Sequence, residues 1–569
     1  MWVAIIIRDS PVPGLGKKTN PNVTLHSPLT GGQACLPVGR IWVSVFVFLL
    51  LSPVHSLQAA VYRVGPSHTY ATLQQVAGLL SPGDSVLVDG DAAYPGGVIF
   101  TRPGSAAEPI VVHGVRINGH RPVIEGGTNG VEFRTSGTAA DHYVFEGFEV
   151  RNASFRGIYH HADDLTLRDL VVHHCNNGLM GADNDSGTLL LEYCEFYANG
   201  SGDRAHQIYM ATDEAAHPGS VFRMQFCYMH DGAGGNNVKS RSERNEIYYN
   251  WIEGGFYHEL ELIGPDPSGG VPANAKREDS DVVGNILRKR ATAYSGGTFS
   301  VTRFGGDGTG ESKGRYRVVN NTIIMGTGSA FRLFDSLESV EMHNNVFVSH
   351  TGAAAPIIRT VEAFWTSGEK ISGQNNWVQN VLTTIPAGWT GTIGGDDPGF
   401  RDAAGGDFSP ASGSPLIDAG TSGGQAPPGF PFTEPLFPPV FEPPVEKLPD
   451  RGGAAPRQIT GAIDIGAFEY RQATHVAMAG GPEAFALFQN FPNPFNPKTV
   501  VSSWLLVASE VRLGVYDMLG RQVAVLVNER REAGRYRDTF DGSGLASGMY
   551  IYRLRVGAFD ESRTMLLLR

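Results

Sequence analysis

The sequence has little charge, few cysteines and no apolar run long enough to cross a bilayer. Charged residues are 18% of the 569 residues, whereas an average soluble protein has about 25%. Acidic residues outnumber basic ones by 57 to 45, a net charge of −12, which excludes binding of nucleic acid through a large basic excess. The cysteines form no disulfide scaffold and no CxxC or Cys/His metal pattern, so we expect small buried residues at Cys35, Cys175, Cys194 and Cys227.

Glycine, in contrast, is abundant, at 72 of 569 residues, or about 13% against the usual ~7%. High glycine with low charge is typical of many turns between short strands rather than of long helices. Hydrophobic residues are 41% of the chain, which is enough for a large core and excludes global disorder.

The N-terminal region predicts export. Arg40 precedes the apolar run 41–51, and small residues such as Ala59 follow it. This order is typical of a secretory signal peptide, which we place at 39–59. The run is too short for a transmembrane helix, so we expect no integral membrane span in the mature chain. Residues 1–38 resemble no signal segment and are interpreted as a spurious extension from a translation start placed too early.

A short motif recurs from about 140 to 380. Its clearest copies are VVNNTII (318–324), MHNNVFV (342–348) and GQNNWV (373–378). The repeated position is occupied by Gly147, Asp169, Cys194, Cys227, Asn250, Asn285, Asn321, Asn345 and Asn376. The interval between successive positions is shortest, at 22 residues, from Gly147 to Asp169, and longest, at 36 residues, from Asn285 to Asn321. Repeats that share a minimum length and differ in the number of extra residues predict stacked solenoid coils with loops of different length. The asparagines predict a ladder of side-chain amides.

The two ends of this region also follow a known pattern. TLQQVAGLL (72–80) predicts an amphipathic capping helix, and GDSVLV (83–88) predicts the first coil. The exit reads GDFSPASGSPLIDAG (406–420) and GAIDIGAFEY (461–470). Together these segments resemble the right-handed parallel β-helix of the pectate-lyase-like (pectin lyase-like) superfamily. The resemblance implies an all-β solenoid over 60–470, with capped ends that predict a monomer.

Two further segments follow from the sequence. The proline-rich stretch 422–457 predicts an extended arm lying on the solenoid. Residues 471–484 are interpreted as a linker, and 485–569 as a small Ig-like antiparallel β-sandwich.

The last domain carries distinctive motifs. NFPNPFNP (490–497), VYDMLGR (515–521), AGRY (533–536) and LASGMYIYRL (545–554) occur in order. They resemble the C-terminal sorting domain of the type IX secretion system. The resemblance implies a Gram-negative host, the type IX secretion machinery as a partner, and a secreted or outer-surface location.

Alternation along the predicted strands assigns the side chains that face outward. We expect Ile208, Val238, Leu260, Phe299 and Phe331 to point inward. The main outward column is then Tyr159, Met180, Tyr209, Lys239, Glu261, Ser300 and Arg332. The column before it contains Gln207, Asn237 and Glu259, and the column after it contains Arg241 and Ile263.

The stretch GNNVKSRSERNEIYYN (235–250) resembles the lysine-bearing coil of the chondroitinase-B/alginate-lyase family. The resemblance implies a polysaccharide lyase acting on uronic-acid glycans, with Lys239 as the base. That family has an arginine on the following coil, where this chain has Ile263, so Arg241 is the substitute. Glu259 and Glu261 are candidate Ca²⁺ ligands. The candidate substrate-binding residues are Tyr209, Asn237 and Arg332.

Other interpretations remain open at this point. Lys239 and Glu261 could form only a surface ion pair. A glycoside hydrolase could use Glu259 and Glu261 as its carboxylate pair, and Asp183 with Asp185 could bind Ca²⁺. Recurring histidines could form a cluster: His160, His161, His206, His230 and His258. A non-catalytic glycan-binding or adhesive rod would need only exposed aromatics, with candidates Tyr159, Tyr209, Tyr257 and Phe304.

Overall fold

The computed structural model describes residues 59–567, apart from 135–139, 183, 265–277, 292–299, 307–312, 335–336, 361–362, 445–446, 448–452, 472–484, 489, 491–494, 496, 506, 518–519, 533 and 558. The predicted N-terminal extension, all but the end of the signal peptide, most of the linker, and Asp183 and Phe299 lie outside the described residues. None of the described helices is long and apolar enough to cross a membrane.

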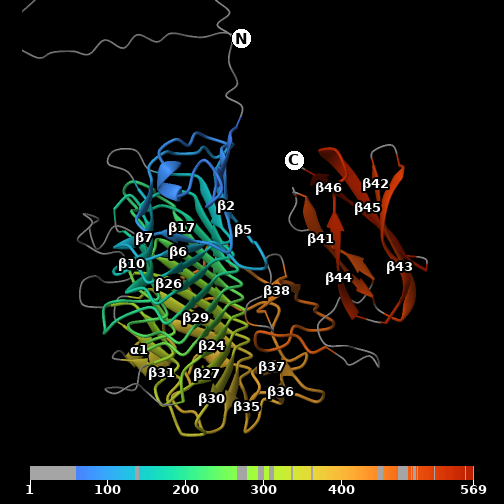
Figure 1. Ribbon diagram of the computed structural model, residues 1–569. Helices are drawn as coiled ribbons and strands as arrows, with labels where there is room; N and C mark the ends of the chain where they lie inside the picture. Colours follow the sequence, from blue (N-terminus) through green and yellow to red (C-terminus); the bar gives the residue numbers. More distant parts are fainter. Residues whose placement is uncertain are drawn as a thin grey trace, which may run out of the picture. The chain divides into compact units, whose positions relative to one another are not determined.

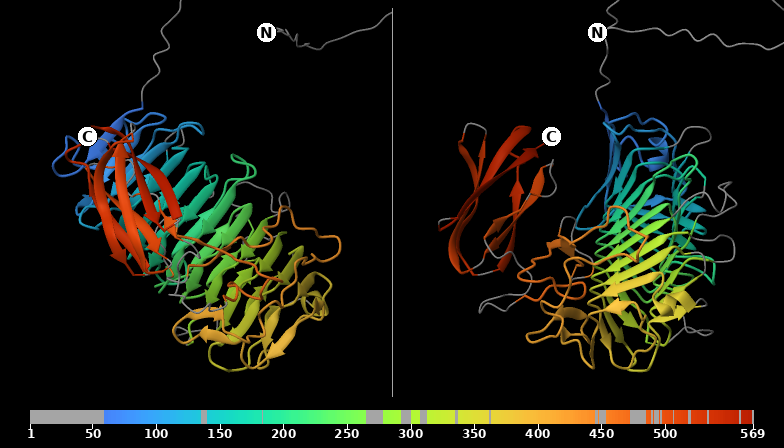
Figure 2. Two further views of the ribbon diagram at one scale, coloured as in Figure 1. Left: turned by 90° about the vertical axis from the view of Figure 1, so that its right-hand side faces the viewer. Right: turned by 180° about the vertical axis from the view of Figure 1, so that it is seen from behind.

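The described part of residues 59–470 is a parallel β-helix built from three long parallel sheets (Figures 1 and 2). Sheet A contains β1 (Val61–Val64), β2 (Ser85–Asp89), β5 (Ile110–Val115), β8 (Tyr143–Glu146), β11 (Leu165–Arg168), β14 (Leu189–Glu192), β17 (Val221–Gln225), β20 (Arg244–Tyr248), β23 (Asp279–Val283), β26 (Arg315–Val319), β29 (Ser339–His343), β32 (Ile371–Gln374) and β34 (Trp389–Thr390). Sheet B contains β3 (Ala93–Pro95), β6 (Val123–Glu125), β9 (Glu149–Arg151), β12 (Val171–His173), β15 (Glu195–Tyr197), β18 (Tyr228–His230), β21 (Trp251–Glu253), β24 (Ile286–Arg288), β27 (Thr322–Met325), β30 (Val346–Ser349), β33 (Trp377–Gln379) and β35 (Ile393–Gly395).

Sheet C contains β4 (Val98–Phe100), β7 (Asn129–Phe133), β10 (Arg156–His160), β13 (Asn177–Gly181), β16 (Ile208–Ala211), β19 (Val238–Arg241), β22 (Leu260–Leu262), β25 (Thr302–Phe304), β28 (Phe331–Leu333) and β31 (Ile358–Thr360). A typical coil gives one strand to each sheet in turn, as β8, β9 and β10 do. The predicted parallel β-helix is therefore confirmed.

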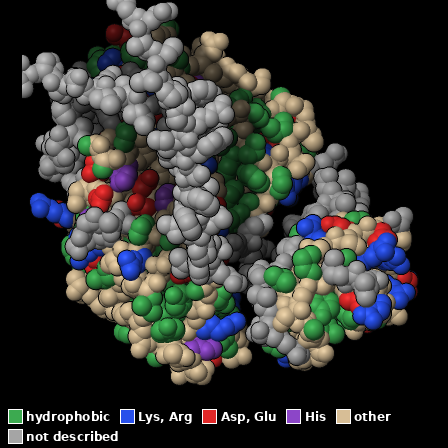
Figure 3. Space-filling model, turned by 90° about the horizontal axis from the view of Figure 1, so that it is seen from above, with side chains coloured by type: hydrophobic (Ala, Val, Ile, Leu, Met, Phe, Trp, Pro, Cys, Tyr) green, Lys and Arg blue, Asp and Glu red, His purple; other side chains and the backbone are tan. Residues whose placement is uncertain are grey.

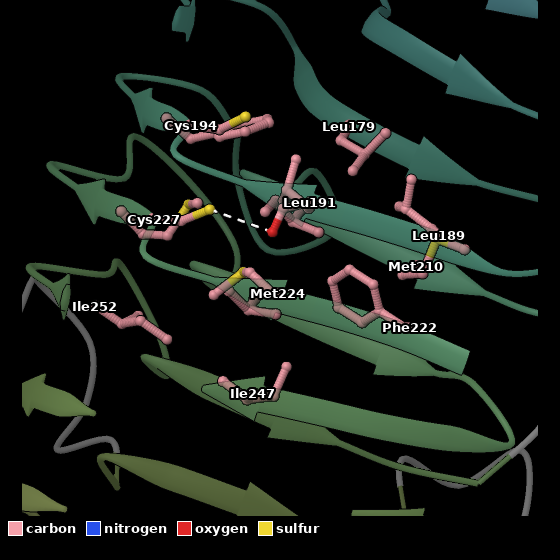
Figure 4. Packing of buried hydrophobic residues seen from close by; sticks show 14 of the residues in the cluster. Leu179, Leu189, Leu191, Cys194, Met210, Phe222, Met224, Cys227, Ile247 and Ile252 are labelled. Carbon is pink, nitrogen blue, oxygen red and sulfur yellow. Dashed lines mark hydrogen bonds between the residues drawn. The ribbon is translucent and has the colours of Figure 1, made fainter. Parts of the chain in front are cut away.

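The core fills the inside of the coils with apolar side chains. In β2, Val86 and Val88 are buried while Ser85, Leu87 and Asp89 are partly exposed, as alternation requires. One continuous cluster runs from Val64 to Trp389, and Figure 4 shows its middle. Cys194 and Cys227 belong to this cluster, and the Sγ of Cys227 lies 3.6 Å from the carbonyl oxygen of Leu191. The prediction of small buried cysteines is confirmed there.

The asparagine ladder is present at the turn between sheets A and B. The side-chain amide of Asn285 donates to Oδ1 of Asn321 at 2.9 Å, and that of Asn321 donates to Oδ1 of Asn345 at 3.1 Å. Each amide also donates to a main-chain carbonyl of the preceding coil. The predicted positions Gly147 and Asp169 are wrong by one residue, because both have positive φ in the turn that precedes the ladder position.

The N-terminal end is closed by a shorter element than predicted. Only η1 (Leu73–Gln75), a single 3₁₀ turn, forms within the expected helix 72–80. Gln75 Oε1 accepts hydrogen bonds from the backbone N–H groups of Ala71 and Thr72, at 2.6 and 3.1 Å. Val76 and Leu80, which follow this turn, are buried in the core of the solenoid without forming further helix. The other short helix is α1 (Ala363–Ser367).

The proline-rich arm lies on the outer side of the solenoid, as predicted (orange in Figure 2). Leu436 donates its N–H to Asp281 of β23 at 2.8 Å, and Val440 donates to the Tyr249 hydroxyl at 2.9 Å. The remaining short strands of this region are β36 (Phe400–Asp402), β37 (Asp407–Pro410), β38 (Phe441–Glu442) and β39 (Ala455–Pro456).

The C-terminal domain is an antiparallel β-sandwich. One sheet contains β40 (Ala486–Leu487), β41 (Lys498–Leu505) and β44 (Gly534–Asp541), and the other contains β42 (Ser509–Asp517), β43 (Gln522–Arg531), β45 (Gly548–Val556) and β46 (Phe559–Leu567). The domain has its own core, which includes Val501, Leu513 and Tyr552. Its surface carries ion pairs such as Arg531 with Asp538 at 2.8 Å, and Figure 3 shows one face with basic and acidic side chains side by side.

Candidate functional site

The outward face of sheet C stacks charged side chains in one column. The strand register places Tyr209, Lys239, Glu261, Arg303, Arg332 and Arg359 on successive strands from β16 to β31. Adjacent coils of such a solenoid are about 4.8 Å apart. The prediction of Ser300 in this column is wrong: Thr302 pairs with Leu260, so Arg303 takes the outward position next to Glu261.

Glu261 lies between two cations of this column. Its Oε1 is 2.7 Å from Nη1 of Arg303, and its Oε2 is 3.9 Å from Nζ of Lys239. The Asn236 side-chain amide also donates to Oε2. Glu261 as a whole residue is only 2% exposed. The Lys239 and Arg303 side chains are 14% and 17% exposed. The surface therefore presents the cations, and the carboxylate holds them in place.

Tyr209 and Arg241 form a second contact beside Lys239. Nε of Arg241 donates to the Tyr209 hydroxyl at 3.1 Å, and its Nη1 donates to the carbonyl oxygen of Gly264 at 2.9 Å. The Lys239 Nζ lies 5.1 Å from the centroid of the Tyr209 ring. Arg241 is two residues from Lys239 on the same strand but is buried. Its hydrogen bond therefore orients the Tyr209 phenol.

Asn236, which the sequence did not indicate, and His206, which it indicated only as part of a histidine cluster, support this group. The backbone N–H of Asn236 donates to Nδ1 of the buried His206 at 2.9 Å. Burial, with a smaller effect of the nearby Lys239 charge, lowers the pKa of His206 to about 3. His206 is therefore neutral at neutral pH and accepts this hydrogen bond without adding charge. The only available signal was the recurrence of histidine at coil starts.

The column predicted to lie beside the site faces the interior instead. Gln207, Asn237 and Glu259 are fully buried and form a chain of side chains: Gln207 donates to Asn237 at 2.8 Å, and Asn237 donates to Glu259 at 2.6 Å. Strict alternation fails because two successive residues turn inward where the chain enters sheet C, as Gly157 and Ile158 do in β10. Asn237 therefore does not reach the exposed face.

Glu259 pairs with a cation of the next coil. Nζ of Lys289 lies 3.3 Å from its Oε1, and the Gly255 N–H donates to Oε2 at 2.9 Å. Burial raises the pKa of Glu259 and lowers that of Lys289. Glu259 and Glu261 thus contact different partners and offer no common Ca²⁺ site. In the described parts of the chain, no group of three or more His, Cys, Asp or Glu residues is arranged to hold a metal ion.

The three arginines C-terminal to Glu261 form a positive stripe. Arg303 pairs in register with Arg332, and Arg332 with Arg359. The guanidinium groups of Arg303 and Arg332 lie 4.7 and 4.4 Å from the centroid of the Phe334 ring. Burial and then the neighbouring Arg303 and Arg359 lower the pKa of Arg332. Like charges held this close favour an anionic partner.

Other predicted candidates are not assembled into a site. The five histidines form no single cluster: His160 is in the interior and His230 belongs to β18 of sheet B, while His206 and His258 both hydrogen-bond to Asn236. Phe304 is buried and stacks on Tyr316 with ring centroids 4.5 Å apart, so its prediction as an exposed aromatic is wrong.

The C-terminal sandwich matches the family model of the secretion system C-terminal sorting domain over residues 489–566. No curated protein matches the chain. The chain is therefore a parallel β-helix protein with a C-terminal type IX sorting domain. That domain directs it to secretion or to the outer cell surface.

Several solved structures are similar to the β-helix at low sequence identity. A PL6 family polysaccharide lyase from Pseudopedobacter saltans is 14% identical, with 58% of this chain and 92% of that chain covered and a TM-score of 0.34. The XylC complex with xylose is 9% identical, with 60% and 87% covered and a TM-score of 0.38. The PL6 family alginate lyase AlyGC is 13% identical, with 59% and 40% covered and a TM-score of 0.29. This chain thus spans less than half the length of AlyGC. Likenesses this distant transfer no activity.

Removal of the C-terminal domain tests the export route. A chain ending at Arg471 is expected to keep the thermal unfolding midpoint of the β-helix, because the sandwich has its own core. The truncated chain should be absent from the cell surface and medium and should accumulate inside the cell envelope. Immunoblots of fractionated cells give the result. Surface exposure equal to that of the full chain would contradict the role of the domain.

Proposed function

We propose that the outward face of sheet C binds an acidic polysaccharide and that the group around Lys239 cleaves it by β-elimination. The observation that carries the proposal is the column of Lys239, Arg303, Arg332 and Arg359, with its single carboxylate, Glu261, almost fully buried. A positive stripe in a chain with a net charge of −12 is suited to an anionic ligand. A linear polymer with one carboxylate per sugar presents charges in a row, as the stripe does.

β-Elimination from a uronate breaks the C5–H bond and the C4–O bond and forms a C4–C5 double bond. In the proposed geometry, the Lys239 amine takes the C5 proton as general base. Arg303 and Arg332 donate hydrogen bonds to the sugar carboxylate and stabilise the charge that develops on it. The Tyr209 phenol, oriented by Arg241, donates the proton to the leaving oxygen. Arg241 is thus a positioning residue.

Binding without cleavage is the second candidate. It is favoured by the ion pairs of Glu261 with Lys239 and Arg303, which by themselves need no reaction. A binding rod would retain the salt-sensitive attraction to anionic glycans and release no product.

The deciding experiment incubates the full mature chain with alginate, polygalacturonate and a glycosaminoglycan panel, with and without added Ca²⁺. The unsaturated uronate end formed by elimination is followed by its ultraviolet absorbance. We expect a rise with at least one polymer. Binding without any rise would establish the binding rod, and reducing ends without an absorbance rise would establish hydrolysis.

The positive stripe makes its own prediction. The double variant Arg332→Gln/Arg359→Gln should weaken binding of a polyuronate about a hundredfold or more, because it removes two charge-assisted hydrogen bonds that are each worth about 1.5–3 kcal/mol. The remaining affinity should depend less on salt. Titration calorimetry at two salt concentrations measures both effects. Arg223→Gln, on sheet A with a side chain 48% exposed, is the matched control and should bind as the native chain does; an equal loss in the control would contradict the prediction.

A further inference from the structure

A second cluster of aromatic and basic side chains lies on sheet C, toward its N-terminal end. The guanidinium of Arg156 lies 3.7 Å from the centroid of the Phe155 ring and 3.8 Å from that of the Tyr159 ring. Its Nε is 3.0 Å from Sδ of Met180, and its Nη1 is 3.4 Å from Oδ1 of Asn129. A long flexible side chain is thus held in one place at the surface, although no acidic group is hydrogen-bonded to it among the contacts that the described residues make.

The surroundings of this cluster are suited to a sugar acid. Phe155 is 40% exposed, although it is a large apolar side chain. Arg134, whose side chain is 48% exposed and lies 2.6 Å from Glu132, adds a second guanidinium directly after β7 of the same sheet. An exposed ring beside an ordered guanidinium offers the apolar face of a pyranose a stacking surface and offers its carboxylate a planar donor.

The cluster is continuous with the site around Lys239. Strand register places Tyr159 next to Met180, Met180 next to Tyr209, and Tyr209 next to Lys239. Tyr159 is therefore three coils from Lys239, which is about 14 Å along the solenoid. A linear polymer that lies along the outward column at Lys239 passes over Met180 and reaches this cluster.

We propose that Phe155, Arg156 and Tyr159 form a distal subsite that binds one uronate residue of the acidic polysaccharide lying across Lys239. This inference rests on the proposed function for its ligand class and adds a requirement on ligand length. Phe155 stacks on the sugar ring, and Arg156 donates to its carboxylate. The protein thus holds long chains through contacts on both sides of Lys239 and binds short oligomers without the distal contact.

The test uses alginate and polygalacturonate oligomers of graded length, titrated calorimetrically into the full mature chain carrying Lys239→Ala, so that no ligand is consumed. Adding Phe155→Ala or Arg156→Gln should weaken binding about tenfold for oligomers long enough to span three coils. The same changes should leave dimers and trimers unaffected. Ile385→Ala, which truncates another exposed apolar side chain (44% exposed), is the control and should change neither.

The outcomes separate this subsite from the proposed reaction. A length-dependent loss supports the subsite, whether or not the native chain forms product. A loss equal at all lengths, or no loss, overturns the subsite even where the native chain forms product. Oligomers of both series that fail to bind the Lys239→Ala chain at any length also overturn it. Absence of product with a length-dependent loss overturns only the lyase.

Discussion

Replacement of Lys239 by alanine is expected to lower the turnover of a polyuronate by about 10²–10⁴-fold, the usual contribution of a positioned general base. Binding should weaken far less, because Arg303, Arg332 and Arg359 remain in the column. The fold should be retained as well, since Glu261 keeps its ion pair with Arg303 at 2.7 Å. Initial rates of unsaturated uronate formation and calorimetric affinities, measured on the same preparation, give both numbers.

Two further variants make this prediction specific to the amine. Lys239→Arg keeps the charge but not a group that loses its proton readily, so it should bind normally and turn over as poorly as Lys239→Ala. Lys498→Ala removes an exposed lysine from the C-terminal domain and should match the native rate. A Lys239→Ala chain with native turnover would remove Lys239 from the mechanism, whatever its effect on affinity.

The second large effect is expected from the buried pair inside the solenoid. Lys289→Met should lower the free energy of unfolding of the β-helix by about 3–5 kcal/mol at neutral pH, because it leaves the Glu259 carboxylate buried without its cation. Glu259 lies at 3.3 Å from the lysine Nζ and is fully buried. Urea unfolding followed by tryptophan fluorescence measures the change.

The pH dependence of this variant follows from the sign of the pKa shift. Burial already raises the pKa of Glu259, and loss of the lysine raises it further. A carboxyl with a raised pKa in the folded state favours folding below its unfolded pKa, and this contribution is lost as pH rises through the folded pKa. The defect should therefore be smaller in acid than at neutral pH. Adding Glu259→Gln to Lys289→Met should restore most of the stability. A defect independent of pH and unrepaired by Glu259→Gln would show that lost packing, not charge, is its cause.

Much of the fold could be predicted from the sequence, because the repeated turn has a local chemical requirement. An asparagine such as Asn321 follows a residue with positive φ and hydrogen-bonds to the next coil, so its recurrence marks the coils from Asn250 to Asn376. The sorting motifs are equally local. Both kinds of motif can be recognised in the sequence although the loops between the coils differ in length.

The candidate site was harder to predict, because its geometry depends on where each strand begins. Leu262 and Thr302 are separated by 39 residues, and no pattern in that stretch fixes which residue pairs with Leu260. Arg303 was therefore missed, and Ser300 was placed in its position. Asn237 and Glu259 were assigned outward by alternation, which fails at the turn into sheet C. Lys239, Glu261 and Arg332 were placed correctly because their strands pair without a shift.

The amide ladder also has an evolutionary consequence. From Asn250 to Asn376, each coil is joined to the next by amides at one short turn, while the connection that follows can grow without disturbing that turn. Mutation can therefore lengthen, shorten or exchange a loop between coils and leave the stacking intact. Such loops border sheet C, so new specificities can evolve, or be engineered by grafting, at little cost to foldability. The loops that contact a ligand can therefore change while the stacked strands and the amide ladder stay the same.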